Sequence, residues 1–85
     1  MILRYTDEAC SKIKKACAKN IELDKALSRK IAFILQNPSQ FKPLMHGLKG
    51  KRGVHILKSF VLIYKIEGDI VYIIDFEHHD EAYKR

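Results

Sequence analysis

Residues 59–76 read SFVLIYKIEGDIVYIIDF, two apolar runs joined by the turn residues Glu67-Gly68-Asp69. Both runs are rich in β-branched and aromatic residues, which favour extended backbone. Two such runs on either side of a short glycine-containing turn are typical of a β-hairpin. We therefore predict strands at residues 59–66 and 70–76, paired as a hairpin.

Outward from this hairpin, a third strand is predicted at residues 54–57 and a short strand at residues 2–5. Two helices are expected between them. The first follows Thr6, a residue that favours the N-cap position, and Asn20 is its expected end. The second ends at Asn37-Pro38, because the residue before proline disfavours helical backbone. Its predicted apolar stripe comprises Leu23, Leu27, Ile31, Ile34 and Leu35.

The resulting order, β-α-α-β-β-β, predicts one α+β domain over residues 1–85. In this domain a two-helix hairpin packs on one face of a small, mainly antiparallel, twisted sheet. Cys10 and Cys17 are too far apart on one helix to form a disulfide, and we expect both to be small buried residues. The sequence has no long apolar run and no signal-peptide pattern, so we expect a cytoplasmic protein without a membrane contact.

Charge is unevenly distributed along the chain. The formal net charge is +6, yet no Asp or Glu occurs from Lys25 to Ile66, a segment with nine Lys and Arg residues. Clustered cations attract phosphates and acidic proteins. The pattern therefore predicts a polyanionic partner, with an ordinary solvated basic surface as the alternative.

A basic loop lies at the start of the predicted sheet region. Lys49, Lys51 and Arg52 are flanked by Gly47 and Gly53, and glycines allow backbone N–H groups to approach a phosphate closely. Lys58 and Lys65, on either side of the next strand, extend the same positive charge. A solvated loop without a ligand remains the alternative.

Histidines lie at both ends of the second half of the chain: His55 in a predicted strand, and His78 and His79 after the last one. Histidine transfers protons near neutral pH. If the last strand lies beside the His55 strand, these side chains line one groove suited to RNA cleavage without a metal. Each histidine is otherwise an ordinary surface or core residue. The spacing of histidines, cysteines and acids does not match a zinc site, so we expect no metal or cofactor.

The aromatic residues have two interpretations. Phe60, Tyr64, Tyr72 and Phe76 fit the core of the sheet. Tyr83 lies in the polar tail, where it either stacks on a nucleic-acid base or docks onto the sheet.

The order of these features resembles the RelE/ParE toxin superfamily of type II toxin–antitoxin systems over essentially the whole chain. The residues that carry the resemblance are Leu48-Lys49-Gly50 with Gly53, the run Val61-Leu62-Ile63-Tyr64-Lys65, and the terminal His79-x-x-x-Tyr83. The segment from Lys49 to His55 and the run 62–65 look most like the YafQ-type branch.

The resemblance implies a ribosome-dependent mRNA endonuclease that is neutralised, in a hetero-oligomer, by a RelB-like antitoxin, acidic and partly disordered when free. It implies that His55 transfers protons or orients substrate, that His79 is the general acid, and that Tyr83 occupies an aromatic position of the site. The expected contacts with RNA or the ribosome are Lys49, Lys51, Arg52, Lys58, Phe60 and Arg85.

The chain also departs from the family pattern. Relatives carry arginines that stabilise the transition state where this chain has Val61 and Asp75, and an acid where it has Ser59. Lys58, Arg52 or Arg85 are the candidate replacements. The alternatives are a ParE-like toxin directed at DNA gyrase and an inactive member that retains only antitoxin binding.

Overall fold

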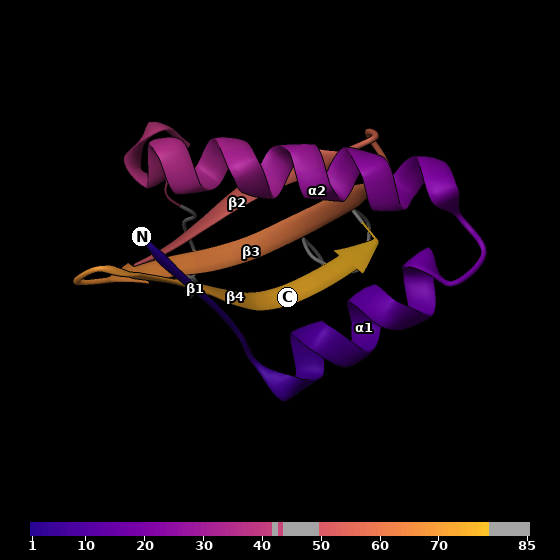
Figure 1. Ribbon diagram of the computed structural model, residues 1–85, viewed down its shortest axis with the longest axis horizontal. Helices are drawn as coiled ribbons and strands as arrows, with labels where there is room; N and C mark the ends of the chain where they lie inside the picture. Colours follow the sequence, from indigo (N-terminus) through magenta and orange to yellow (C-terminus); the bar gives the residue numbers. More distant parts are fainter. Residues whose placement is uncertain (42, 44–49, 79–85) are drawn as a thin grey trace.

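The computed structural model describes residues 1–41, 43 and 50–78, which form one sheet and two helices. In chain order the elements are β1 (Ile2–Tyr5), α1 (Asp7–Cys17), α2 (Ile21–Gln36), the short 3-10 helix η1 (Pro38–Gln40), β2 (Lys51–Ile56), β3 (Phe60–Glu67) and β4 (Ile70–His78). Both helices pack against the sheet through one apolar core, and the chain reverses direction between them (Figure 1). The predicted α+β class and element order are confirmed.

The β3–β4 hairpin lies at the centre of the sheet, whose strand order is β1-β4-β3-β2. Glu67 pairs with Ile70 across a loop whose first residue, Gly68, has φ +57. Tight hairpins need left-handed backbone at this position, which glycine adopts without a Cβ clash. β2 pairs antiparallel with β3, whereas β1 runs parallel to β4, so one of the three pairings is parallel.

β2 and its turn differ from the prediction. The strand begins at Lys51, so part of the expected basic loop is extended backbone in the sheet. Leu57, predicted as strand, and Lys58 instead form the turn to β3, with φ of 54° and 69°. Side chains with a Cβ rarely adopt this left-handed conformation. The pattern missed the turn because the sequence there contains neither Asn nor Gly, which are typical of such positions.

β4 contains one extra residue relative to β3. Tyr64 pairs with Ile73 and Ile63 pairs with Asp75, which leaves Ile74 outside the β3–β4 ladder. This arrangement is a β-bulge, and it changes which side of the sheet the following residues face.

Polar side chains begin both helices. The Thr6 hydroxyl accepts a hydrogen bond from the Ala9 N–H at 3.1 Å, as predicted for an N-cap, and donates to the Ile74 carbonyl at 2.9 Å. One residue thus caps α1 and also binds the bulge of β4. The Asn20 side chain accepts from the Leu23 N–H at 3.0 Å. Asn20 therefore begins α2 and is not the last residue of α1, because its amide oxygen satisfies a free N–H of the next helix.

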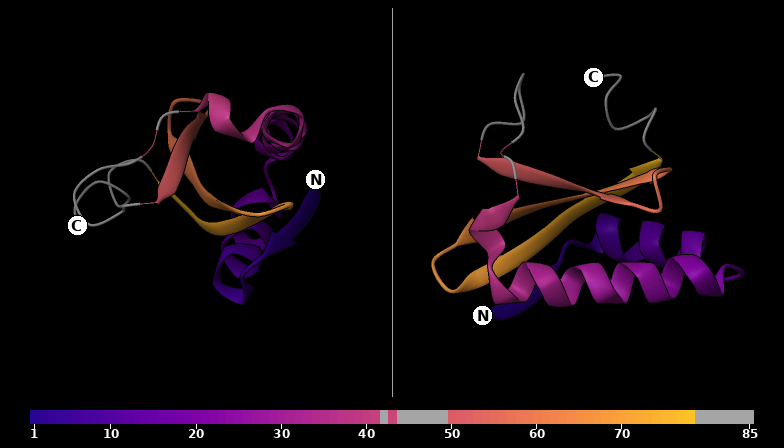
Figure 2. Two further views of the ribbon diagram at one scale, coloured as in Figure 1. Left: turned by 90° about the vertical axis from the view of Figure 1, so that its left-hand side faces the viewer. Right: turned by 90° about the horizontal axis from the view of Figure 1, so that it is seen from above.

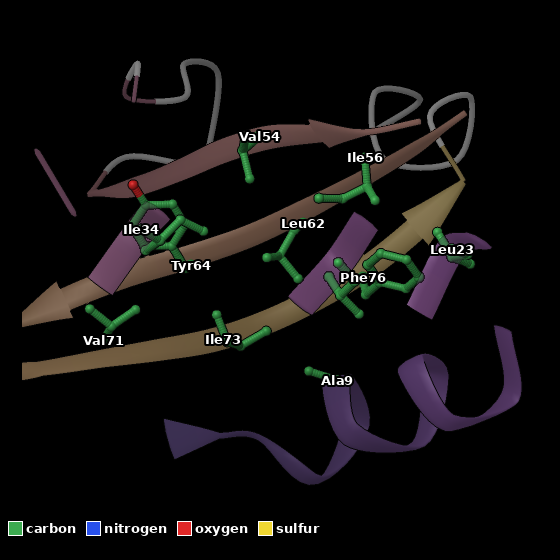
Figure 3. Close-up of a cluster of buried hydrophobic side chains, with 11 residues drawn as sticks. Ala9, Leu23, Ile34, Val54, Ile56, Leu62, Tyr64, Val71, Ile73 and Phe76 are labelled. Carbon is green, nitrogen blue, oxygen red and sulfur yellow. The ribbon is translucent and has the colours of Figure 1, made fainter. Parts of the chain in front are cut away.

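The core lies between the helices and one face of the sheet, and side chains of both layers point into it (Figure 3). Its buried members are Ala9, Leu23, Leu27, Ile34, Val54, Ile56, Leu62, Tyr64, Val71, Ile73 and Phe76. Ile31 and Leu35, predicted with the α2 stripe, are only partly buried. Cys10 and Cys17 are free thiols and are half-buried, so they are less buried than predicted. Neither helix among the described residues is long and apolar enough to span a membrane.

Candidate functional site

The face of the sheet opposite the main core, which we call the outer face, carries two of the predicted site residues, His55 and Lys51. Residues directly opposite each other in antiparallel strands point to the same side. The register therefore gives three rows across β2, β3 and β4: His55-Val61-Glu77, Gly53-Ile63-Asp75 and Lys51-Lys65-Tyr72. Val61 and Ile63 form a buried cluster separate from the main core, which assigns these rows to the outer face.

His55 is an exposed residue near the end of β2. The condition for a single groove, that the last strand lies beside the His55 strand, is not met, because β3 separates β2 from β4. With strands about 4.8 Å apart, His55 and Glu77 are separated by roughly 10 Å. His78 is the last residue of β4, not part of the tail, and pairs with Phe60 in the neighbouring row. The two histidine-bearing strand ends thus lie at the same end of the sheet but are not adjacent.

Lys51 and Lys65 face each other directly across β2 and β3. Two like charges at this spacing repel and destabilise a strand pair. Lys65 is partly compensated, because its Nζ lies 3.3 Å from Glu67 Oε2 and 5.5 Å from the centre of the Tyr72 ring. The outer face therefore presents two cations at the end opposite to His55, an arrangement suited to phosphate groups.

Arg52 has a structural contact that sequence reasoning missed. It pairs with Tyr64, whose ring is in the main core, and so lies on the helix side of the sheet. Its Nη1 donates to the Phe41 carbonyl at 2.6 Å, while the Tyr64 hydroxyl donates to the Pro38 carbonyl at 2.5 Å. Burial raises the pKa of Tyr64, and the nearby Arg52 charge opposes that rise. Arg52 thus anchors the segment after α2, and its predicted contact with RNA stays a prediction.

Lys58 lies in the turn between β2 and β3, and Phe60 is the first residue of β3. Lys58 is exposed at the tip in left-handed backbone. The Phe60 ring stacks on Phe76 with 5.2 Å between ring centres and meets the His78 ring edge-on at 5.7 Å. Phe60 is only half-buried and lines a pocket of about 340 Å³ between α1 and the sheet, together with Lys15. Its position fits both predicted roles, core packing and stacking on a base.

Lys12 forms a charge cluster with one carboxylate of its own helix and two carboxylates of β4. Its Nζ lies 2.6 Å from Glu77 Oε1, 2.9 Å from Asp75 Oδ1 and 3.1 Å from Glu8 Oε1. Burial alone would lower the pKa of Lys12, but the hydrogen bonds to the three carboxylates raise it above its ordinary value. Asp75 and Glu77 therefore hold α1 against β4 through Lys12. Glu8 is four residues away on the same helix, whereas Asp75 and Glu77 are 63 and 65 residues away in the chain, beyond any local periodicity.

The remaining predicted site residues, Lys49, His79, Tyr83 and Arg85, lie outside the described residues. Across the parts of the chain that the structure does describe, no three His, Cys, Asp or Glu side chains come close enough to hold a metal ion.

Comparisons with known proteins match almost the full chain. The family model described as "ParE toxin of type II toxin-antitoxin system, parDE" matches residues 3–83. "Putative toxin RelE4" of Methanocaldococcus jannaschii is 37% identical over 86 residues, which cover 99% of this chain and 88% of that protein.

Solved structures with the same fold are also found. The YoeB/ParE toxin from Agrobacterium tumefaciens has a TM-score of 0.83 at 15% identity and covers 93% of this chain and 99% of its own. YafQ in the Escherichia coli DinJ-YafQ toxin-antitoxin complex has a TM-score of 0.75 at 21% identity, with 95% and 94% covered. At these identities the likeness establishes the fold alone.

Proposed function

The chain belongs to the ParE toxin family of type II toxin–antitoxin systems, within the RelE/ParE superfamily, and we propose that it is a ribosome-dependent mRNA endonuclease. The superfamily predicted from the sequence is confirmed. Its closeness to the YafQ-type branch stays a prediction, as do its enzymatic activity and the roles of individual residues.

One observation carries the proposal: His55 and the Lys51–Lys65 pair share the outer face of a single sheet. His55 lies four positions along β2 from Lys51, a distance of roughly 13 Å. A single strand of RNA that follows the β2 edge of this face, beside the buried Val61 and Ile63, would reach both. The lysines would bind the phosphate backbone while the histidine end faces the bond to be cut.

The chemistry needs no metal. A base removes the proton from a 2′-hydroxyl, whose oxygen attacks the adjacent phosphorus. Lysine and arginine side chains stabilise the charge of the crowded phosphorane, and an acid protonates the departing 5′-oxygen. We assign the acid to His79 and the proton-transfer or orienting role at the strand end to His55, with Tyr83 stacking on a base. The ribosome supplies most of the substrate positioning, which suits a protein of only 85 residues.

Primer extension on an mRNA in a purified translation system, with and without ribosomes, tests this proposal. We expect cleavage at defined codon positions only with ribosomes, reduced by about 10²-fold or more in His79→Ala, the scale of one proton-transfer group. Lys14→Ala, on the exposed side of α1, is the matched control and should cut at the parental rate. Cleavage unaffected by His79→Ala moves the chemistry to His55 or the lysines. Absence of any cleavage contradicts the enzyme and leaves an inactive member or the alternative below.

The second candidate is a toxin directed at DNA gyrase, because the family model that matches residues 3–83 is that of ParE. The basic surface would then bind protein or DNA, and the histidines would be incidental. Blocked DNA supercoiling without RNA cleavage would identify this function, and cleavage without an effect on supercoiling would exclude it.

The proposed partners are a cognate antitoxin, the ribosome and mRNA. Solved relatives include toxin–antitoxin complexes, which supports an antitoxin for this chain as well. An acidic, partly disordered antitoxin suits the acid-free tract from Lys25 to Ile66, since such a segment folds onto a charged surface as it binds.

A further inference from the structure

The segment between α2 and β2 is held against the sheet by side chains of both β2 and β3. After the short helix η1, Phe41 has extended backbone with φ −87° and ψ 150°, and Pro43 forms an isolated antiparallel bridge with Arg52. The described part of this segment, residues 38–41 and 43, leads from the end of α2 towards the start of β2 (Figure 2). Because β3 lies on one side of β2, Pro43 bridges to its other edge.

Two hydrogen bonds join the segment to neighbouring strands. The Arg52 Nη1 donates to the Phe41 carbonyl at 2.6 Å, and the Tyr64 hydroxyl donates to the Pro38 carbonyl at 2.5 Å. The Phe41 ring also meets the Tyr64 ring edge-on, with 6.4 Å between ring centres. We call these contacts, together with the Pro43–Arg52 bridge, the Arg52–Tyr64 clamp.

Tyr64 gives the clamp a rigid base. Its side chain is 0% exposed and belongs to the main core, with the hydroxyl at the edge of the cluster (Figure 3). Close packing fixes the ring, so the hydroxyl holds a defined position. Because Tyr64 is fully buried, any effect of its hydroxyl on a ligand must pass through other residues.

The clamp lies where two like charges weaken the sheet. Arg52 follows Lys51, and successive residues of a strand point to opposite faces. Arg52 therefore lies on the helix side, while Lys51 points to the outer face, directly opposite Lys65. Repulsion between the two lysines favours separation of this end of β2 from β3. The clamp opposes that separation, because Arg52 and Tyr64 are themselves partners in the β2–β3 register and both bind the same segment.

Holding the two lysines together matters for a ligand with several phosphates. Two cations bind a phosphate backbone more tightly when their spacing is set before the ligand arrives, since ordering a loose strand end during binding costs free energy. The side chains that set the spacing lie on the other face of the sheet from the lysines that use it.

We propose that Arg52 and Tyr64 are positioning residues for phosphate binding: by tying β2 and β3 to one segment, they keep Lys51 and Lys65 side by side on the outer face. The inference rests on the proposed function, because RNA is the ligand that supplies the phosphates. Loss of the clamp should raise KM for message on the ribosome and leave kcat unchanged, because only binding is affected.

Tyr64→Phe tests the proposal, since it removes one hydroxyl and keeps both the ring in the core and the net charge. KM and kcat for mRNA cleavage are measured in a purified translation system at varied concentrations of programmed ribosomes. We expect KM to rise about 5-fold, the scale of one hydrogen bond, with the parental kcat. Amide hydrogen exchange at residues 51–53 should be faster in the variant, while exchange at residues 70–73 of β4 stays parental. Arg52→Gln should raise KM and speed the same exchange.

A Lys51→Gln background shows whether Tyr64 acts through Lys51. Without the Lys51 cation there is no repulsion with Lys65 to oppose, so Tyr64→Phe should change KM by less than about 2-fold there. Leu27→Val is the matched control, because it lowers stability from a buried position on α2 and should leave KM parental.

The outcomes separate this inference from the proposed function. An unchanged KM in Tyr64→Phe would overturn the positioning role, while cleavage by the parent leaves the proposed function intact. An equal rise in KM in the Lys51→Gln background would also overturn it, since the effect would not pass through Lys51. A rise of the same size in Leu27→Val would show that KM follows stability alone and would overturn it as well. A parent that does not cleave mRNA on ribosomes would overturn the proposed function itself.

Discussion

Two halves of the molecule differ in how their charges are matched. In the half formed by α1 and β4, Lys12 lies within 3.1 Å of three carboxylates from two elements. In the half formed by α2 and β2, the sequence from Lys25 to Ile66 contains no acid, and Lys51 faces Lys65 across the sheet. The positive charge of the chain is therefore carried mainly by the sequence from Lys25 to Ile66.

This difference separates charges that hold the fold from charges offered to partners. A lysine between low-exposure carboxylates stabilises the native state, because removing it leaves those carboxylates poorly matched. A lysine opposite another lysine destabilises the native state slightly and gains from an anionic ligand. Stability and binding should thus respond to substitutions in different halves of the molecule.

The largest effect on stability should come from Lys12→Met. Asp75 and Glu77, with side chains 11% and 10% exposed, would lose the Lys12 cation, whose own side chain is 32% exposed. We expect the free energy of unfolding to fall by about 2 kcal/mol, below the value for a fully buried pair because of solvent screening. Urea denaturation measures this change. Lys14→Met, an exposed lysine of the same helix, should stay within about 0.5 kcal/mol of the parent. Equal losses of unfolding free energy in the two variants would show that Lys12 stabilises the fold no more than an exposed lysine does.

Lys51→Glu should have opposite effects on the two properties. The substitution turns the repulsion with Lys65 into an attraction, so Tm should rise slightly, while ribosome binding or mRNA cleavage should fall by about 10-fold through loss of a phosphate contact. Ribosome co-sedimentation and thermal unfolding on the same preparation measure both. A fall in both Tm and ribosome binding would show that Lys51 stabilises the fold, as Lys12 does.

Arg52→Gln tests whether one cation of the half formed by α2 and β2 stabilises the fold. The guanidinium contact to the Phe41 carbonyl would be lost, and we expect a loss of about 1 kcal/mol in the free energy of unfolding. Lys51→Gln, one residue away, is the control and should leave stability close to that of the parent. If Arg52→Gln reduces ribosome binding without reducing stability, Arg52 is a ligand contact, as the sequence suggested, and not an anchor.

The smallest effect concerns alkaline pH. Lys12 has a native pKa raised above its ordinary value of 10.5, so its contribution to stability is complete below that pH and is lost as the pH rises further. Burial raises the pKa of Tyr64 from 10.0, which acts in the same direction. We expect about 1 kcal/mol less stability at pH ~11 than at pH ~9, with a smaller drop in Lys12→Met. An equal drop in parent and variant would exclude Lys12 as a source.

The sequence predicted what depends on local pattern. The hairpin around Gly68, the cap at Thr6 and the end of α2 before Pro38 all follow from neighbouring residues. The family, too, followed from short motifs in the right order.

The sequence did not predict the features that depend on strand order or on contacts between residues far apart in the chain. It could not place β3 between the histidine-bearing strands, nor join Lys12 to Asp75 across 63 residues. The strained turn at Leu57 was missed for the opposite reason, because its residues contradict the local rule for such turns.

Ile74, which lies outside the β3–β4 ladder, determines which face of the sheet each of the following residues of β4 points to. Because one extra residue intervenes, Phe76 turns into the core while Asp75 and Glu77 turn outward to Lys12. If Ile74 instead paired with Ile63 in a regular ladder, the residues after it would exchange faces, driving two carboxylates into an apolar interior and a phenyl ring into water. Deleting Ile74 itself would keep the faces unchanged, because Ile73 and Asp75 already pair with the neighbouring residues Tyr64 and Ile63. The strand should therefore tolerate the loss of this one residue better than the insertion of a further residue beside it.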